Sequence, residues 1–184
     1  MTITNEDNMV MMARYPDKYF DLAIVDPPYG IGETWKKDRK SKFYKHTSSY
    51  KNNLIPDADY FTELFRVSKN QIVWGANYYT EFLPASKSWI VWDKFRSRKT
   101  HMAEAELAWT SLNNKNTIIY KIPWNGFVIT GERFGAHPHE KPVQIYKNCL
   151  TDFAKPGDRI LDTHLGSGSI AIACHDYGFD LTAC

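Results

Sequence analysis

The sequence predicts an α/β fold in which a mostly parallel sheet is flanked by helices. Short apolar runs of strand length alternate with amphipathic segments of helical length along the 184 residues, and this alternation is typical of βαβ units. Apolar residues make up 43% of the chain and aromatic residues 15%, so disordered, collagen-like and coiled-coil proteins are excluded. At this length we expect a single domain over residues 1–184.

The elements of the first two thirds can be assigned in order. Residues 20–26 (FDLAIVD) form an apolar run ended by two prolines, which predicts a buried strand. Residues 58–69 have the apolar spacing of a helix, which Asp57 would cap and Asn70 would stop. Apolar runs predict further strands at 71–75, 89–92, 105–111 and 117–122.

The last third continues the alternation. Pro142 would open a helix whose inward side chains are Val143, Tyr146, Leu150 and Phe153. Residues 159–162 (RILD) predict a strand, and a glycine-rich turn leads from it into a helix that stops at Gly178. Residues 179–184 begin one more strand.

Charge and cysteine content narrow the class of protein. Lys and Arg number 23 against 21 Asp and Glu, so a partner rich in phosphates would have to bind a local basic patch. The three cysteines have no CxxC spacing, which disfavours disulfides and zinc and fits a reducing compartment. No apolar run approaches about 18 residues and no signal-peptide pattern opens the chain. We therefore expect a cytoplasmic protein with no membrane partner.

One segment is strongly basic. Residues 35–51 (WKKDRKSKFYKHTSSYK) carry seven Lys or Arg against one acid, with aromatic residues between them. This composition predicts a mobile basic loop at about 34–56 that contacts a nucleic-acid backbone, and the candidate residues are Lys36, Lys37, Arg39, Lys40, Lys42 and Lys45. A second basic group, with Phe95 interleaved, would contact phosphate or else form a solvated loop, and it comprises Lys87, Lys94, Arg96, Arg98 and Lys99. Lys94 also follows a strand-like run, so lining the cleft is an alternative for it.

The first candidate site is the turn Asp26-Pro27-Pro28-Tyr29, which follows the strand at 20–26. Open α/β sheets bind ligands at the carboxyl ends of their strands. Asp26 precedes a proline and is therefore held extended, and the prolines have no N–H, so the turn presents acceptors. A carboxylate, a carbonyl and an aromatic ring suit a planar ring with an exocyclic amine. The alternative is a plain turn in which Asp26 is a cap.

The second candidate site is the turn at residues 162–169 (DTHLGSGS), between a strand and a helix. Glycines allow a ligand close to the backbone, and the helix N-terminus offers donors. Gly166, Gly168 and Ala171 also fit the dinucleotide pattern G-x-G-x-x-A, so a nicotinamide-dependent oxidoreductase is an alternative. This alternative leaves the Asp-Pro-Pro-Tyr turn unexplained, and the sequence has no acidic residue about 20 positions after the glycines, where the dinucleotide pattern requires one. A glycine-rich turn without a ligand is the other alternative.

Taken together and in this order, DPPYG, HPHEKPVQIY and GDRILDTHLGSGSIAIA resemble the β-class amino-group DNA methyltransferases. FRVSKNQIVWGANYY, WIVWDK and AELAWTS match as well, so the resemblance covers nearly the whole chain. It implies a Rossmann-like methyltransferase fold, S-adenosylmethionine as methyl donor, DNA as substrate, and no metal. D-P-P-Y is usual in adenine-N6 enzymes and S-P-P-Y is commoner in cytosine-N4 enzymes, so the resemblance implies adenine-N6 transfer. A cytosine-N4 enzyme and a DNA-binding protein with impaired catalysis remain alternatives.

The resemblance also assigns roles by position. Asp26 and the Pro27 carbonyl would accept from the target amine, Pro28 belongs to the same catalytic motif, and Tyr29 would stack on the flipped base. Residues that would surround the cofactor are Asp26, His137, Lys141, Asp162, Thr163, Gly166, Gly168 and Ser169, with Lys141 a candidate for its carboxylate. Residues 95–135 would contain the target-recognition region.

The sequence departs from the family pattern in a few places. The family usually has D-P-F-x-G-S-G-T, whereas here Thr163, His164 and Ser169 replace three of those residues, and His139 replaces Thr in H-P-T-x-K-P. An acidic residue for the ribose hydroxyls normally follows the second cofactor strand, but this sequence ends at Cys184. We therefore expect either a form truncated at the C-terminus or an incomplete cofactor site. The resemblance also implies a bacterial or phage-encoded enzyme of the restriction-modification kind, and a homodimer remains open.

Overall fold

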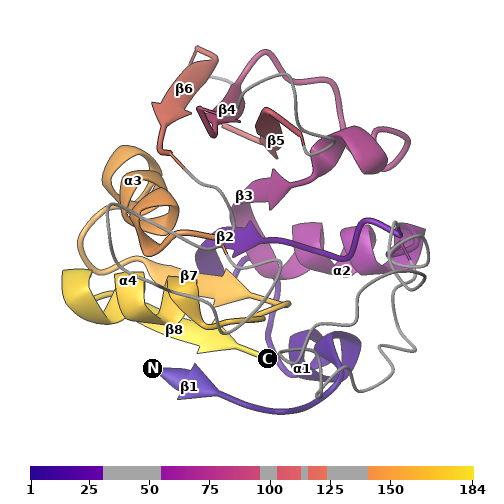
Figure 1. Ribbon diagram of the computed structural model, residues 1–184. Coiled ribbons are helices and arrows are strands. Elements are labelled where there is room, and N and C mark those ends of the chain that lie inside the picture. The colour runs from indigo at the N-terminus through magenta and orange to yellow at the C-terminus, as the bar shows by residue number, and fades with distance from the viewer. Residues whose placement is uncertain (31–54, 96–102, 113–115, 124–140) are drawn as a thin grey trace, which may run out of the picture.

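A computed structural model describes residues 1–30, 55–95, 103–112, 116–123 and 141–184, and these form a central sheet with helices on both faces (Figure 1). The strands are β1 (Thr2–Ile3), β2 (Phe20–Val25), β3 (Ser68–Trp74), β4 (Trp89–Asp93), β5 (Ala105–Thr110), β6 (Ile118–Lys121), β7 (Arg159–Asp162) and β8 (Asp180–Ala183). The helices are α1 (Asn8–Ala13), α2 (Ala58–Val67), α3 (Val143–Phe153) and α4 (Ser169–Tyr177), with a short 3₁₀ turn, η1, at Ala76–Tyr78.

The sheet has the strand order β1-β8-β7-β2-β3-β5-β4-β6. All neighbouring strands in the described residues are parallel except at β5, which runs antiparallel to both β3 and β4. The prediction of a mostly parallel sheet flanked by helices is confirmed. Central parallel strands are covered on both faces, which explains why β2 and the second half of β3 are continuous apolar runs.

Alternate side chains of the central strands enter two separate cores. Leu22 and Ile24 of β2 pack with residues of α3 and α4, whereas Ala23 and Val25 pack with residues of α1 and α2. Figure 1 accordingly shows α3 and α4 together on one side of the strands and α1 and α2 on the other. The candidate sites lie where β2 and β7 end, at Asp26 and Asp162.

Most predicted boundaries are confirmed, and one is wrong. The Asp57 carboxylate caps α2 by accepting from the Tyr60 N–H at 3.1 Å, and Gly178 ends α4 in the left-handed conformation (φ 73°). Asn70 does not stop α2, because the helix already ends at Val67 and Asn70 pairs with Leu22 inside β3. Long-range strand pairing therefore begins before the local stop signal is reached.

Other differences are smaller. The inward face of α3 includes Ile145 and Cys149, whereas Val143 and Phe153 are only partly buried. Strand β1 and helix α1 lie in a segment for which the sequence predicted no element. Within the described ranges, no helix combines the length and apolar character needed to cross a membrane.

Candidate active site

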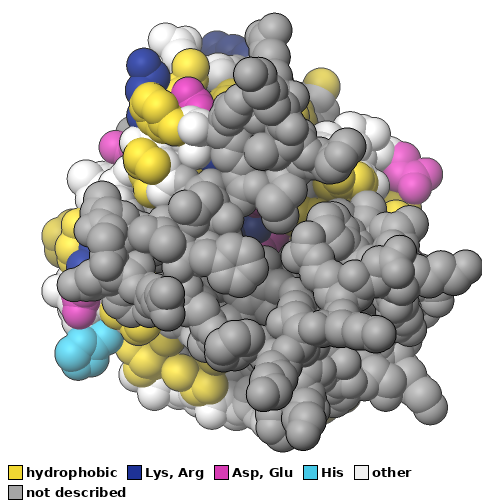
Figure 2. All heavy atoms as spheres, viewed as in Figure 1, with side chains coloured by type: hydrophobic (Ala, Val, Ile, Leu, Met, Phe, Trp, Pro, Cys, Tyr) yellow, Lys and Arg dark blue, Asp and Glu magenta, His cyan; other side chains and the backbone are white. Residues whose placement is uncertain are grey.

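Polar groups from five segments meet at one edge of the sheet. Asp26 follows β2, Gly75 follows β3, Lys94 follows β4 and Asp162 ends β7. Strand β5 is reversed, so its amino end, which carries Glu106, lies at this same edge opposite Trp92. Figure 2 shows a hollow near the centre of the view with basic and acidic side-chain atoms at its bottom.

Both oxygens of the Asp26 carboxylate accept hydrogen bonds. The Tyr29 hydroxyl donates to Oδ1 at 2.6 Å, and the Lys141 ammonium donates to Oδ2 at 2.5 Å. Lys141 also donates to the Tyr29 hydroxyl at 3.0 Å. Burial and the adjacent Asp26 carboxylate raise the pKa of Tyr29, so its hydroxyl stays protonated as a donor. Since each carboxylate oxygen can accept two hydrogen bonds, Asp26 keeps capacity for a further donor.

The Tyr29 ring is held by close packing. It stacks on Tyr78 with ring centroids 5.0 Å apart and an interplanar angle of 14°. It also lies directly against Gly75, where a Cβ would come within 2.1 Å of the ring. Gly75 has φ 68°, so both its backbone conformation and this contact require glycine.

Tyr79 holds the two prolines of the turn. Its single hydroxyl proton is shared between the Pro27 carbonyl, at 2.7 Å, and the Pro28 carbonyl, at 2.8 Å. The Pro27 carbonyl predicted to accept from a target amine therefore already accepts one hydrogen bond. A carbonyl oxygen has two lone pairs, so a second donor remains compatible with this contact.

Lys141 lies at the centre of a chain of four charges. Its side chain is 6% exposed, and its Nζ lies 3.1 Å from Glu106 Oε2 as well as 2.5 Å from Asp26 Oδ2. Lys94 donates to Glu106 Oε1. Burial alone would lower the pKa of Lys141, but the Asp26 and Glu106 carboxylates outweigh it and raise the pKa. Burial alone would raise the pKa of Glu106, and the two ammonium groups instead lower it to about 2.

The position of Lys94 corrects one prediction. Lys94 was expected to face phosphate, but it is 8% exposed and its ammonium lies 4.6 Å from the centroid of the Trp92 ring. The reason is the pairing of β4 with β5, which places Glu106 beside it and turns the cation inward. Lys94 thus belongs to the buried charge chain.

The glycine-rich turn contains a second buried carboxylate. Asp162 is 2% exposed and accepts from the His164 N–H at 3.0 Å. Burial raises the pKa of Asp162 to about 7. Gly166 (φ 54°) and Gly168 (φ 81°) are both left-handed. A Cβ at Gly168 would meet no described atom within 4 Å, whereas a Cβ at Gly166 would lie 3.7 Å from the His164 carbonyl oxygen.

The two unusual residues of this turn are joined in a polar network. Thr163 Oγ1 lies 2.7 Å from the Tyr60 hydroxyl and 2.9 Å from His164 Nδ1. The Asn8 amide nitrogen lies 3.1 Å from His164 Nε2. Burial lowers the pKa of His164 to about 4, so the imidazole is neutral near pH 7. These contacts attach the turn to α1 and α2 and satisfy the polar atoms that the departures from the family pattern introduce.

Several predicted site residues lie outside the described residues. They are His137, the basic residues Lys36, Lys37, Arg39, Lys40, Lys42, Lys45, Arg96 and Arg98, and most of the segment 34–56. Of the segment 95–135, the longest described stretches, 103–112 and 116–123, contain β5 and β6. Ser169, by contrast, is buried at the start of α4, where its hydroxyl lies 3.1 Å from that of Ser167.

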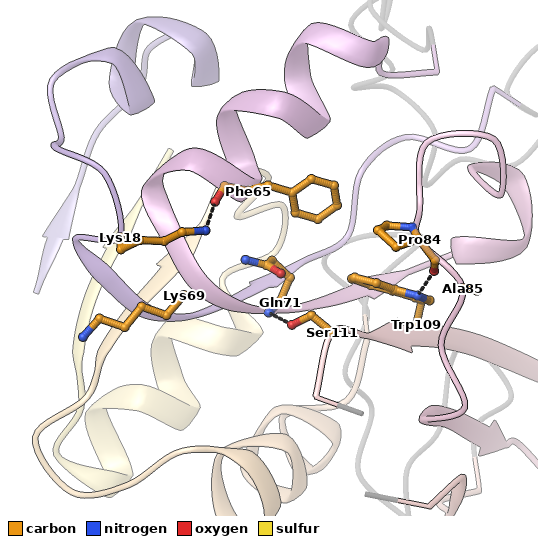
Figure 3. A pocket seen from close by; sticks show the side chains of 8 residues that line it. All are labelled: Lys18, Phe65, Lys69, Gln71, Pro84, Ala85, Trp109 and Ser111. Atoms are coloured by element: carbon orange, nitrogen blue, oxygen red, sulfur yellow. Dashed lines mark hydrogen bonds between the residues drawn. The ribbon is translucent and has the colours of Figure 1, made fainter. Parts of the chain in front are cut away.

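A separate pocket lies along the first half of β3 (Figure 3). Its volume is about 310 Å³, and its lining residues are Lys18, Phe65, Lys69, Gln71, Pro84, Ala85, Trp109 and Ser111. Lys18 donates to the Phe65 carbonyl and Lys69 pairs with Asp21. These lysines are therefore engaged within the protein, and the pocket is distinct from the edge that carries Asp26 and Asp162.

Comparison with protein families identifies the chain. The profile of the DNA methylase family, which comprises N6 and N4 methyltransferases, matches residues 76–180. The chain belongs to the DNA methylase family. The matched part of this DNA methylase includes Glu106, Lys141 and the glycine-rich turn, whereas Asp26 precedes it. S-adenosylmethionine is the methyl donor of the family. Curated protein sequences gave no match.

Solved structures show that the methylase fold extends over the whole chain. The M1.HpyAVI–SAM complex has a TM-score of 0.61 at 15% identity, covering 99% of this chain and 91% of that chain. TTHA0409 from Thermus thermophilus, complexed with S-adenosyl-L-methionine, gives 0.60 at 14% identity, covering 99% and 87%. The cytosine-N4-specific PvuII DNA methyltransferase gives 0.61 at 11% identity, covering 98% and 80%.

The turn at 162–169 of this DNA methylase fits the cofactor of its family. S-adenosylmethionine carries positive charge on its sulfonium and amino groups, and Asp162 is a buried carboxylate that forms no ion pair among the described residues. Open space beside Gly168 allows a ligand near the backbone. The first N–H groups of α4 have no acceptor within the helix and can bind a polar group.

Three site residues were not singled out in the sequence. Glu106 lies within the strand-like run AELAWTS, and Gly75 and Tyr79 lie within VWGANYY, so each was treated as part of a matching stretch. A charged residue inside an apolar run is a signal that could have marked Glu106, since an unpaired buried carboxylate is costly. Nothing local marks Gly75 or Tyr79, because their partners lie on the distant turn at 26–29.

Proposed function

We propose that this DNA methylase transfers a methyl group from S-adenosylmethionine to the exocyclic N6 of adenine in DNA. The observation that carries the proposal is the pairing of β2 with β7, which joins Leu22 to Ile160 and Ala23 to Leu161. This pairing sets the Asp26 turn beside the Asp162 turn, although the two are far apart in the sequence. A set of amine acceptors therefore lies next to a site that fits the methyl donor.

The residues of the first turn can prepare the amine for attack. The N6 lone pair of adenine is delocalised into the ring, so the nitrogen must become more tetrahedral to react. The remaining acceptor positions of Asp26 and of the Pro27 carbonyl favour this change by attracting the N–H groups as positive charge develops. Asp26 then receives the proton that the methylated amine loses. Stacking of the Tyr29 ring on a base that has left the duplex stays a prediction, since that ring stacks on Tyr78 in this structure.

The second turn would hold the cofactor. Asp162 would attract its positive charge, and the backbone at Gly166, Gly168 and Ser169 would contact its polar groups. When bound, S-adenosylmethionine supplies a methyl group on a sulfonium sulfur. The protein would contribute alignment of the amine nitrogen with that methyl group, which is a question of positioning. Lys141 as a ligand of the cofactor carboxylate stays a prediction, and so does His137.

The proposal extends to the substrate partner and the setting. The D-P-P-Y form of the first turn supports adenine, and the basic segment 35–51 would contact the DNA backbone. We place the enzyme in the cytoplasm of a bacterial or phage-infected cell, in a restriction-modification setting. Light scattering would test whether the protein forms a homodimer.

Cytosine-N4 transfer is the second candidate. Asp26 and the Pro27 carbonyl would accept from any exocyclic amine, and the matched family contains both specificities. Identification of the methylated base in the product therefore distinguishes adenine-N6 transfer from cytosine-N4 transfer. DNA from cells expressing the protein should contain N6-methyladenine, measured by mass spectrometry of nucleosides, and DNA from cells expressing Asp26→Ala should contain none. N4-methylcytosine as the sole product would replace adenine with cytosine, and no methylated base in either sample would overturn the proposed activity.

A further inference from the structure

Four charged side chains from four separate segments form one continuous chain. Lys94 follows β4, Glu106 lies in β5, Lys141 precedes α3 and Asp26 follows β2. Lys94 bonds Glu106, Glu106 Oε2 lies 3.1 Å from Lys141 Nζ, and Lys141 bonds Asp26. Two cations and two anions alternate, so the chain carries no net charge. It ends on the carboxylate proposed to face the target amine.

Glu106 is placed specifically for Lys141. Its Oε2 is fully buried and has no hydrogen-bond donor in good geometry within the described part of the protein. The Lys141 ammonium lies 3.1 Å from this oxygen and therefore compensates its buried negative charge. Buried ion pairs contribute little net stability compared with apolar residues of similar size, so stability alone does not account for this placement. A buried charge chain that ends in a reactive site points to a role in that site.

Lys141 in turn fixes both side chains of the proposed amine site. It donates to Asp26 Oδ2 and to the Tyr29 hydroxyl, and Tyr29 donates to Asp26 Oδ1. These three contacts close a ring that sets the rotation of the Asp26 carboxylate. The lone pairs left for an amine then point in a defined direction. An ammonium on a flexible side chain can hold this geometry only if it is itself anchored.

We propose that Glu106 is a positioning residue for methyl transfer, which with Lys94 anchors the Lys141 ammonium so that the Asp26 carboxylate keeps its reactive orientation. The inference rests on the proposed function of Asp26. It holds for either exocyclic amine, since adenine N6 and cytosine N4 need the same acceptor. Glu106 contacts neither substrate nor cofactor in this proposal and acts through Lys141.

The test compares Glu106→Gln, which keeps the shape and removes the charge, with Glu81→Gln, which makes the same change at an exposed glutamate outside the charge chain. Methyl transfer to DNA from labelled cofactor gives kcat and KM. Misplaced reacting groups cost about 100-fold in rate, so we expect Glu106→Gln to lower kcat by about this factor. The KM values and the cofactor Kd should change far less than kcat, and Glu81→Gln should match the wild type.

A double variant separates positioning from charge balance. Glu106→Gln alone leaves the chain with one excess positive charge, and Lys94→Met together with Glu106→Gln restores neutrality. If Glu106 anchors Lys141, the double variant stays as slow as Glu106→Gln. Recovery of the wild-type rate in the double variant would show that Glu106 only balances charge and would overturn the proposal. Glu106→Asp keeps the charge on a shorter side chain and should recover part of the lost kcat.

The Lys141 ammonium supplies a readout that needs no activity. The groups that face it are Asp26, Glu106, Tyr29 and Tyr146. Loss of the Glu106 carboxylate removes one of the two anions that raise its pKa, so NMR of the labelled lysine should show Lys141 titrating at lower pH in Glu106→Gln. An unchanged titration together with an unchanged kcat overturns the positioning role. If the wild type produces N4-methylcytosine, only the proposed base is overturned, and if it produces no methylated base, only the proposed activity is overturned. In both cases the NMR comparison of Lys141 still tests the positioning role of Glu106.

Discussion

Asp26 and Asp162 are carboxylates at the carboxyl ends of adjacent strands, and their surroundings are opposite. Asp26 is paired with the buried Lys141 and bonded by Tyr29. Asp162 is 2% exposed, accepts one N–H from His164 and forms no ion pair among the described residues. In the first turn the protein itself supplies the compensating charge. In the second turn that charge is missing, which suits a site where a cationic ligand completes the structure.

Burial of Asp162 without a cation should lower the free energy of unfolding by a measurable amount. An ionised carboxylate buried without a cation is unfavourable, and burial accordingly raises the pKa of Asp162 to about 7 from an ordinary value of 3.8. Active sites that hold a charged group in an unfavourable environment commonly reduce the stability of the folded protein, because function requires that environment. Substitutions at Asp26 and at Asp162 should therefore differ in their effects on rate, stability and cofactor affinity.

The largest effect is expected from Asp26→Ala. Loss of one preorganised acceptor costs about 3–4 kcal/mol in the transition state, or about a hundred- to thousand-fold in rate. Lys141 loses one of its two anions but keeps Glu106, so the fold should survive with reduced stability, and cofactor affinity should be largely unchanged. The measurement is methyl transfer with the modified base identified by mass spectrometry. Appreciable N6-methyladenine from this variant would falsify the assigned role.

Asp26→Ser is a sharper version of the same test. It recreates the S-P-P-Y form, and a hydroxyl accepts more weakly than a carboxylate. We expect a trace of activity that stays on adenine, because the rest of the base site and the target-recognition region should keep the preference for adenine. A switch of product to N4-methylcytosine would show that the first residue of the turn selects the base.

Asp162→Asn should have the opposite effect on stability. Between about pH 4 and pH 7 the folded protein binds more protons at Asp162 than the unfolded chain, so the free energy of unfolding falls as pH rises through that window. A shift of this size corresponds to at most about 4 kcal/mol. Asn cannot ionise, so the variant should be more stable than the wild type at pH 8 and similar at pH 4. Denaturant unfolding of both proteins at pH 4 and pH 8 tests this. If the variant and the wild type differ in free energy of unfolding by the same amount at both pH values, the prediction is contradicted.

The affinity for the cofactor should depend on the protonation of the Asp162 carboxylate. If a cation binds beside Asp162, binding favours the ionised carboxylate, so affinity for S-adenosylmethionine should rise as pH increases through about 7. The Asp162→Asn variant should bind more weakly and lose this dependence. Calorimetry in two buffers with different ionisation enthalpies would detect the released proton.

Two glycines give a matched pair with a smaller effect. Gly75 and Gly168 have similar left-handed conformations (φ 68° and 81°), so alanine costs about 1–2 kcal/mol of backbone strain at each. At Gly75 the new Cβ would also strike the Tyr29 ring, whereas at Gly168 it would enter free space. Gly75→Ala should therefore mainly lower kcat, and Gly168→Ala should mainly lower cofactor affinity. Equal effects on kcat and affinity in both variants would contradict the division of roles.

The smallest effect per residue is expected in the basic segment. Replacing Lys36, Lys37, Arg39 and Lys40 with Ala should weaken DNA binding and flatten its salt dependence by up to about 0.9 per lost phosphate contact. Lys155→Ala is a matched control, because Lys155 is exposed and precedes β7 at the opposite edge of the sheet. Fluorescence anisotropy over a salt series measures both. A slope equal to that of the control would show that the segment does not contact phosphate.

Much of the fold was predictable because its signals are local. The apolar runs, the Asp57 cap, the Gly178 stop and the two turns at strand ends each depend on a few neighbouring residues. The strand order was not predictable in this way, and neither was the reversal of β5, because pairing depends on residues far apart in the chain. Asn70 shows the limit clearly, since its stop signal is overridden by pairing with Leu22.

The same division holds for the site. The residue types at the strand ends can be read from the sequence: a carboxylate with two prolines at Asp26, and a glycine turn at 162–169. The charged partners of the two carboxylates depend on how the chain folds. Lys141 and Glu106 reach Asp26 from distant segments, Lys94 turns inward, and Asp162 is left without an ion-pair partner among the described residues. The physical reason is that the free energy of a buried charge depends on partners within a few ångströms in space, and a sequence does not contain those distances.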